Sequence, residues 1–253
     1  MARLIVLGSA AAVSDTEHDN THFVLQGERS VVLVDCGSNP MVKLRRFGID
    51  HNQVTDMILT HFHPDHVYGV PMLLMHLWLL GRRIPLRVHG LDHCLLRTED
   101  LMSAFSWDDW PQFFPVAFHR VLAEDGYLVL DNEDFRIWSW PVKHYNIPTI
   151  GLRIESKKSG KLISYSCDTA PISAVQNLAQ DADILIHEST GHDPKGHSSA
   201  YEAGQIAAKA DCKRLILIHY EVWEHDPTPL IDEARVAYDG PIELATDFNV
   251  YDI

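Results

Sequence analysis

Apolar residues in the first half of the chain occur in short runs separated by polar or turn-forming segments, a pattern typical of buried β-strands. These runs predict strands at Leu4–Leu7, His22–Gln26, Val31–Asp35, Met57–Thr60 and Leu86–His89. Three longer segments predict helices: one from Ser38, as its N-cap, to Gly48 with Pro40 in its first turn, one at Val70–Leu80 and one at Leu91–Phe105.

In the second half, strands and helices alternate after a predicted hairpin. The strand candidates here are Phe135–Val142, Ile150–Ser156 and Leu162–Cys167, the last two joined by a turn at Lys157–Gly160. Helices at Ile172–Ala179, Ser199–Ala210 and Pro229–Ala237 then alternate with strands at Ile184–His187, Leu215–His219, Glu243–Ala245 and Val250–Tyr251. Two strand-rich parts with interspersed helices predict a layered α/β fold in which helices cover packed sheets.

No low-complexity tract or Gly/Ser linker interrupts the chain, which predicts one domain over residues 1–253. The apolar run Leu4–Leu7 is too short for the hydrophobic region of a signal peptide, so it is better interpreted as the first strand. The longest apolar stretch, Val70–Leu80, is interrupted by Pro71 and His76 and is too short to span a bilayer. We therefore expect no membrane insertion.

The charge of the chain bears on its partners. With 21 basic and 35 acidic residues, the formal net charge is −14. Such a surface repels polyanions, which disfavours extended nucleic acid as a partner but leaves a small anionic substrate open. The four cysteines are scattered and form no Cys-x-x-Cys pair, which predicts reduced thiols in a cytoplasmic protein.

The strongest chemical signal is the segment Thr60-His61-Phe62-His63-Pro64-Asp65-His66, which follows an apolar strand directly. Imidazole and carboxylate groups are the ligands of catalytic zinc and related ions. Pro64 interrupts regular hydrogen bonding, so we expect a loop at the end of the strand. A histidine-rich polar loop is the alternative, but burying such a cluster without a metal is costly.

This His-x-His-x-Asp-His motif resembles the hallmark of the metallo-β-lactamase superfamily, and three further residues match the order of its remaining ligands. They are His144, Asp168 and His219, each at or just after the end of an apolar strand. The resemblance implies a four-layer αββα sandwich with a binuclear site. It assigns one ion to His61, His63 and His144 and the other to Asp65, His66 and His219, with Asp168 bridging the two.

Two details resemble the ribonuclease Z and phosphodiesterase branch of that superfamily. Two residues separate His66 from Gly69, and the segments 186–190 and 196–200 are similar to elements of this branch. The resemblance makes His197 the candidate general acid; helix capping by the turn at residues 196–198 is the alternative. Only 23 residues separate His144 from Asp168, so the long arm with which ribonucleases Z hold tRNA is missing there.

These features predict a metal-dependent hydrolase that cleaves a small phosphodiester or related ester. A hydroxide held by two divalent ions would attack phosphorus, Asp65 would orient it, and His197 would protonate the leaving group. Zinc suits the ligands best, and Mn²⁺ or Fe²⁺ also fit. A homodimer is compatible with the branch. The alternatives are a ribonuclease Z-type tRNA 3′-processing endonuclease, an iron-dependent oxidoreductase on the same fold, and a non-enzymatic scaffold.

An aromatic cluster has two interpretations. Trp107, Trp110, Phe113, Phe114 and Phe118 could form a wall over a pocket that stacks a ring, or they could pack in the core or at a dimer contact. We favour packing, because large aromatic side chains bury extensive surface wherever they lie.

Overall fold

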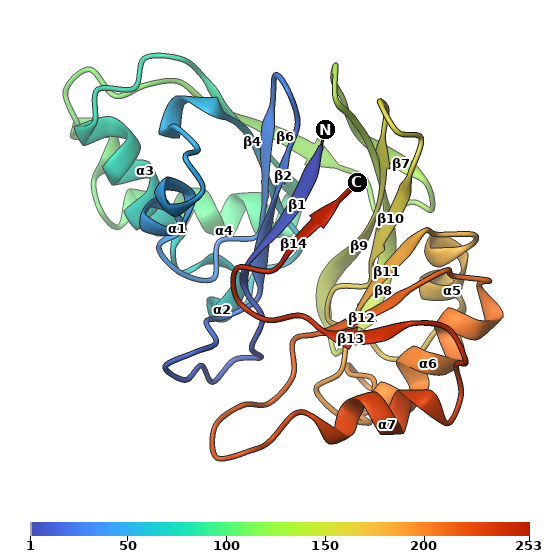
Figure 1. The fold of residues 1–253 in the computed structure, drawn as a ribbon. Helices are drawn as coiled ribbons and strands as arrows, with labels where there is room; N and C mark the ends of the chain where they lie inside the picture. Colours follow the sequence, from blue (N-terminus) through green and yellow to red (C-terminus); the bar gives the residue numbers. More distant parts are fainter. Residues whose placement is uncertain (1) are drawn as a thin grey trace.

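The computed structural model describes residues 2–253, which form two seven-stranded sheets with helices on their outer faces (Figure 1). The first sheet has the order β14 (Val250–Asp252), β1 (Arg3–Gly8), β2 (His22–Gln26), β3 (Val31–Val34), β4 (Val54–Leu59), β5 (Leu86–Leu91) and β6 (Val116–Val121). The second has the order β13 (Ile242–Leu244), β12 (Leu215–Ile218), β11 (Ile184–Glu188), β10 (Leu162–Tyr165), β9 (Ile147–Ser156), β8 (Phe135–His144) and β7 (Tyr127–Asp131).

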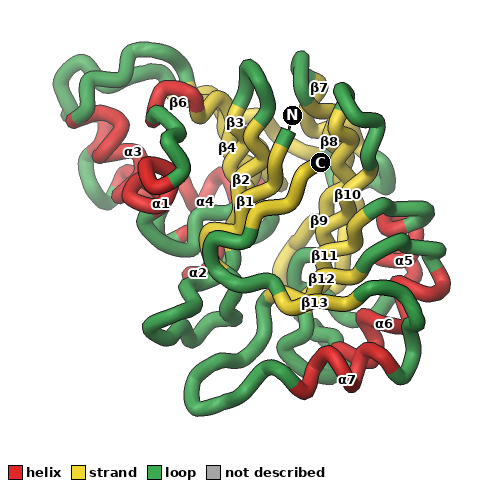
Figure 2. Tube along the Cα trace, in the orientation of Figure 1, coloured by secondary structure: helices red, strands yellow, loops and turns green. Residues whose placement is uncertain are grey.

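The helices lie in two groups, one against each sheet (Figure 2). The first sheet is covered by α1 (Pro40–Arg46), α2 (Pro64–Val67), α3 (Val70–Leu79) and α4 (Asp92–Ser103), with short 3₁₀ turns at His51–Gln53 and Trp107–Asp109. The second is covered by α5 (Ser173–Ala179), α6 (Ala200–Lys209) and α7 (Pro229–Arg235). Among residues 2–253, no helix is long and apolar enough to cross a membrane.

Three apolar cores follow from the alternation of side chains along the strands. In β4, Ile58 points into the core between the two sheets, whereas Met57 and Leu59 pack in the core between the first sheet and its helices. A third core joins the second sheet to α5, α6 and α7. The four-layer αββα arrangement implied by the resemblance is therefore confirmed.

Most predicted elements are present, and three details were wrong. Asn39, not Ser38, caps α1, because its side chain accepts the Met41 N–H at 3.2 Å. The segment after His63 is not a loop but the short helix α2, since proline is favoured at the first helical position. Strands β6 and β7 were not predicted, because polar and apolar residues do not alternate clearly along them.

The aromatic cluster belongs to the core between α3 and the first sheet. Trp110 stacks on Trp78 with ring centroids 4.8 Å apart, and Phe113 meets Trp110 edge-on at 5.4 Å. Among the described residues, none of the cluster lines the cavity of the candidate site described below. Core packing is therefore the correct interpretation.

A carboxylate in the turn before β8 joins the two sheets at the end opposite the candidate site. Asp134 accepts backbone N–H groups of Glu28 (3.1 Å), Arg29 (2.9 Å) and Ser30 (2.9 Å), and also the Ser30 hydroxyl (2.8 Å). The approach is so close that a Cβ on Gly27 would lie 2.3 Å from the Asp134 carboxyl carbon. Burial favours the neutral form, but these hydrogen bonds more than offset it and lower the pKa of Asp134.

Asp134→Ala is expected to lower the free energy of unfolding by about 1–3 kcal/mol, because it leaves several N–H groups without their charged acceptor. Since the pKa of Asp134 is lowered in the folded state, its contribution is present above the unfolded pKa and is lost as the pH falls through the folded value. Urea unfolding at neutral and acidic pH measures both effects. Asp125→Ala, in an exposed turn, is the control. A cost equal to that of the control would contradict this role.

Candidate active site

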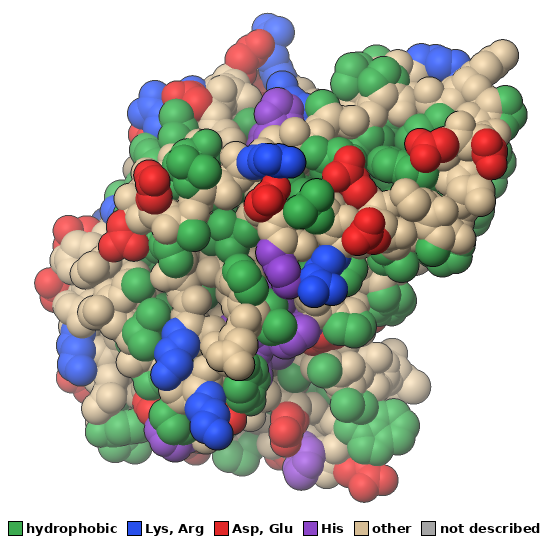
Figure 3. All heavy atoms as spheres, turned by 180° about the vertical axis from the view of Figure 1, so that it is seen from behind, with side chains coloured by type: hydrophobic (Ala, Val, Ile, Leu, Met, Phe, Trp, Pro, Cys, Tyr) green, Lys and Arg blue, Asp and Glu red, His purple; other side chains and the backbone are tan. Residues whose placement is uncertain are grey.

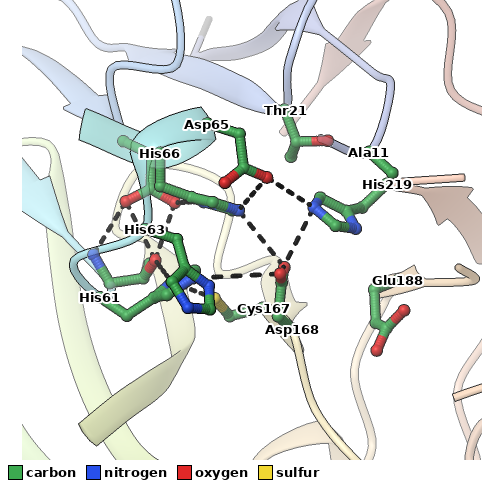
Figure 4. A network of polar contacts seen from close by, with 12 residues as sticks. Ala11, Thr21, His61, His63, Asp65, His66, Cys167, Asp168, Glu188 and His219 are labelled. Carbon is green, nitrogen blue, oxygen red and sulfur yellow. Dashed lines mark hydrogen bonds and ion pairs between the residues drawn. The ribbon is translucent and has the colours of Figure 1, made fainter. Parts of the chain in front are cut away.

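All seven predicted metal-binding residues lie together at one edge of the two sheets. Figure 4 labels all of them except His144. The seven residues come from five places in the fold: the segment after β4 (His61), the start of α2 (His63, Asp65 and His66), the end of β8 (His144), the segment after β10 (Asp168) and the segment after β12 (His219). Strands β4, β10 and β12 are mostly buried, whereas β8 is half-buried and ends in His144 itself. The fold therefore brings residues that are distant in sequence into one cluster.

Three histidines form the first group. The His63 Nδ1 atom lies 3.2 Å from His61 Nε2 and 2.9 Å from His144 Nε2. An Asp168 oxygen lies 3.8 Å from His144 Nε2 and 4.0 Å from His61 Nε2. Three ring nitrogens that face one another with a carboxylate beside them have the composition of a site for a divalent cation.

Asp65, His66 and His219 form the second group. Asp65 Oδ2 lies 3.6 Å from His66 Nε2 and 3.5 Å from His219 Nε2. The two oxygens of Asp168 complete the group, at 3.5 Å from His66 Nε2 and 3.4 Å from His219 Nε2. Asp168 therefore contacts both groups, as a bridging ligand must.

Partners behind the histidines fix which ring nitrogen faces the centre. His66 Nδ1 donates to Asp35 Oδ2 at 2.9 Å, and His144 Nδ1 donates to the Gly196 carbonyl at 2.9 Å. His219 Nδ1 lies 2.8 Å from the Thr190 hydroxyl. With a proton on Nδ1, each ring directs the lone pair of Nε2 toward the cluster, which is the tautomer that a metal requires.

Several buried polar atoms of the cluster have no hydrogen-bond partner in the described part of the chain, as expected of atoms that bind a metal ion. Among residues 2–253, His66 Nε2, His219 Nε2 and Asp168 Oδ1 are buried without a hydrogen-bond partner. Burying such groups unpaired costs free energy, and a bound cation removes that cost. The residues present therefore fit divalent metal ions.

The charges within the cluster are set by burial and by neighbouring groups. Burial lowers the pKa of His61 well below its ordinary value, so this ring is neutral. Burial opposes charge on Asp168, but the His219 and His66 rings more than offset it and hold the pKa of Asp168 well below its usual range. Burial also opposes charge on Asp65, yet the nearby His219 and His66 rings lower the pKa of Asp65. Burial opposes charge on His66 and His219, but the Asp168 carboxylate beside them more than offsets it and raises the pKa of both rings. Ionised carboxylates among imidazole rings are the donor set that divalent metals bind, and metal binding would displace the protons of the two rings.

His197 lies beside this cluster. Its ring centroid is 4.8 Å from that of His144, and its Nδ1 is 3.1 Å from Glu188 Oε1. Burial lowers the pKa of His197, but the hydrogen bond and charge of Glu188 raise it by more, so the net shift is upward. The N-cap of α6 is Ser199, not His197, which leaves the His197 ring available for chemistry.

A cavity of about 470 Å³ opens over the cluster. It is lined by His63, Asp65, His144, Asp168, Thr190, His197 and His219, by the buried Ala11 and Val222, and by the exposed residues of its rim, Ala12, Val13, Tyr145, Glu221, Trp223 and His225. Figure 3 shows histidine side chains reaching the surface near the centre of one hollowed face of the molecule. A small molecule in the cavity would therefore contact the candidate ligands directly.

The residues behind the histidines were missed by sequence reasoning. Asp35 and Glu188 are buried acids, one directly after β3 and the other at the end of β11. Besides His197, Glu188 accepts the backbone N–H groups of Thr169, Thr190 and Ser198. The signal that could have identified both acids is the one that identified His61: a polar residue where an apolar strand ends.

Comparisons with known proteins agree with this geometry. Ribonuclease Z of Gemmatimonas aurantiaca is 30% identical, with 94% of this chain and 95% of that protein aligned. Ribonuclease Z of Methanothermobacter thermautotrophicus is 27% identical over 94% of this chain and 92% of its own. The crystal structure of the metallo-β-lactamase fold protein YhfI from Bacillus subtilis has a TM-score of 0.83 at 21% identity, covering 99% of this chain and 98% of that one.

Fold, cluster and relatives together define a metal-dependent hydrolase of the metallo-β-lactamase superfamily, in its ribonuclease Z- and phosphodiesterase-like branch. More narrowly, the sequence model of the family described as "Anti-Pycsar protein Apyc1" matches residues 2–234. The chain belongs to that family.

The aligned ribonucleases Z carry residues that this chain lacks. Because 94% of the chain is about 238 residues, about 60 of the 298 positions aligned with the Gemmatimonas protein fall opposite gaps in it. The Methanothermobacter alignment of 296 positions gives about 58 by the same comparison. The chain is therefore a shortened relative of these enzymes.

Proposed function

We propose that the enzyme hydrolyses a small phosphodiester with two divalent ions, preferably Zn²⁺, with Mn²⁺ or Fe²⁺ as alternatives. The observation that carries the proposal is the arrangement of two ligand groups that share Asp168 beneath a small cavity. His61, His63 and His144 would hold one ion. Asp65, His66 and His219 would hold the other.

Bound divalent ions supply Lewis-acid charge, which lowers the pKa of water and offsets the negative charge of a phosphate. The residues of the chain do the rest. Asp65, ionised at neutral pH because its pKa is lowered, accepts a hydrogen bond from water and orients it toward phosphorus. His197, protonated and held by Glu188, donates its proton to the departing alkoxide.

The size of the substrate follows from the cavity and the charge of the chain. A volume of about 470 Å³ lies within the range of about 300–1,000 Å³ typical of small-molecule sites. A net charge of −14 repels a long polyanion, and the chain lacks about 60 positions that the aligned ribonuclease Z has. These observations favour a phosphodiester of nucleotide size over tRNA. Cleavage of tRNA at its 3′ end remains the second candidate, because the relatives are ribonucleases Z.

The proposal predicts about two metal ions per chain and hydrolysis of phosphodiesters by the metal-loaded protein. Metal analysis comes first, followed by assays on bis(p-nitrophenyl) phosphate, a panel of 3′,5′-cyclic nucleotides and precursor tRNA. Asp65→Ala, which removes a ligand and the group that orients water, is the control and is expected to abolish turnover. Activity of that variant within about tenfold of the parent would argue against the scheme.

The remaining outcomes separate the alternatives. Cleavage of precursor tRNA at its 3′ end without turnover of the small esters would favour the ribonuclease Z function. One iron per chain without phosphodiester hydrolysis would favour an oxidoreductase. All four cysteines are buried and free, which fits the proposed cytoplasmic location. A homodimer and a single domain over residues 1–253 stay predictions.

A further inference from the structure

The mouth of the cavity carries three large apolar side chains that are exposed to solvent. Val13 is 58% exposed, Tyr145 44% and Trp223 57%. All three line the same cavity as the candidate metal ligands. Exposing apolar surface to water is unfavourable, so a group of such residues around a polar site marks a surface that a ligand covers.

Trp223 is presented by a fixed segment of chain. In the stretch that follows His219, Tyr220 and Val222 are buried, whereas Glu221 and Trp223 are exposed. The Tyr220 carbonyl accepts the Ala11 N–H at 3.0 Å, and the Tyr220 hydroxyl donates to the Ala245 carbonyl. The indole thus projects over the cavity four residues after a candidate metal ligand.

Tyr145, by contrast, is engaged with the loop that carries His197. Its hydroxyl donates to Asp193 at 2.9 Å, and its ring lies 5.7 Å from the His197 ring. A Cβ on Gly196 would come within 2.6 Å of the Tyr145 ring, so the tyrosine packs directly on that glycine. Tyr145 is therefore a positioning residue for His197, and Trp223 is the aromatic side chain that remains for a ligand.

The charges near Trp223 restrict what the ligand carries there. Glu221, which lines the same rim, is 63% exposed and lies 3.7 Å from His225 Nε2. An acidic group at the rim repels a second phosphate or a continuing polynucleotide chain, while the metal-binding floor attracts one phosphate. A ligand that matches both parts has one phosphodiester and a flat, uncharged group beside it.

We propose that Trp223 stacks on the base of a nucleotide substrate and sets the preference for phosphodiesters that carry a base. This inference rests on the proposed phosphodiesterase function. Stacking on an aromatic side chain tolerates every base, because each has a π-face. Trp223 therefore selects for the presence of a base, without distinguishing one base from another.

The test compares a 3′,5′-cyclic nucleotide with the abasic 3′,5′-cyclic phosphate of 1-deoxyribose. For Trp223→Ala, we expect KM for the cyclic nucleotide to rise by about 5- to 150-fold, the loss expected for one base–aromatic stack, with kcat within about twofold of the parent. KM for the abasic ester is expected to stay unchanged. Trp223→Phe keeps an aromatic face and should restore most of the affinity. Trp138→Ala, outside the cavity lining, is the matched control.

Each outcome decides between the two proposals. If the parent enzyme hydrolyses neither ester, the proposed function fails. If it hydrolyses both, and Trp223→Ala changes KM equally for the two esters or for neither, the stacking inference is overturned while the proposed function stands. A Trp223→Phe variant as impaired as Trp223→Ala on the cyclic nucleotide would also overturn it, since an aromatic face would then not be what binds the base.

Discussion

Replacing Asp168 with alanine is expected to reduce the metal content from about two ions per chain to one or fewer, and kcat/KM by at least about 10³-fold. Asp168 is the residue that contacts both ligand groups, with His66 Nε2 at 3.5 Å, His219 Nε2 at 3.4 Å and His144 Nε2 at 3.8 Å. Two dications close together repel each other, and a shared carboxylate would offset part of that repulsion. Metal analysis and steady-state kinetics on the same preparation measure both quantities.

Asp168→Asn is the informative companion variant, because it keeps the shape of the side chain and removes its charge. We expect weakened metal binding and a rate between those of the parent and the alanine variant. The buried ligands also predict that chelators destabilise the parent, since metal binding to the folded state adds to its stability. An Asp168→Ala protein with the parental metal content and turnover within tenfold would contradict the bridging role.

The sequence pointed to the candidate ligands because they are grouped and ordered along the chain. His61, His63, Asp65 and His66 fall in one short segment, and His144, Asp168 and His219 each lie at or just after the end of a strand. The resemblance to a known family supplied the order in which to look for the last three, and the structure brings all seven residues together at one edge of the two sheets. That these residues bind metal stays a prediction.

Which partner stands behind which candidate ligand could not be predicted, because these pairings are set by contacts between distant segments. The Gly196 carbonyl that orients His144 lies 52 residues away from it along the chain. Asp35 hydrogen-bonds His66, which lies 31 residues further along the chain. The backbone of Asp35 has a φ of 58°, in the left-handed region. No residue type marks a backbone carbonyl as a partner. The N-cap of α1 could not be predicted for a similar reason. Ser and Asn are both good helix caps, and only the folded structure shows that Asn39 rather than Ser38 caps α1.

Replacing His197 is expected to slow hydrolysis in a way that depends on the leaving group. A general acid contributes about 10²–10⁴-fold to the rate when an alkoxide must be protonated as it leaves. His197→Ala should therefore lose that factor in kcat on a cyclic nucleotide. It should lose much less on bis(p-nitrophenyl) phosphate, because p-nitrophenolate leaves without a proton. Metal content should stay at the parental level.

His192→Ala is the matched control, since this exposed histidine lies on the same loop and bonds Glu202 rather than Glu188. Its kcat should stay near the parental value on both esters. Equal losses on both esters for His197→Ala would contradict a role as general acid and indicate that the residue supports the site as a whole. A loss of metal in the same variant would indicate that His197 is itself a ligand.

The role of His197 as a general acid predicts the direction in which the rate changes with pH. Glu188 raises the pKa of His197 against the effect of burial, so the ring stays protonated to a higher pH than it otherwise would. The rate on a cyclic nucleotide should fall as the pH rises through that pKa, since the acid form is then lost. Glu188→Gln removes the charge that raises the pKa, so the alkaline limb should move to lower pH. The rate on bis(p-nitrophenyl) phosphate should not show this displacement. A structural role for Glu188 alone would lower both rates at every pH, so the movement of the limb distinguishes control of a proton from support of the loop.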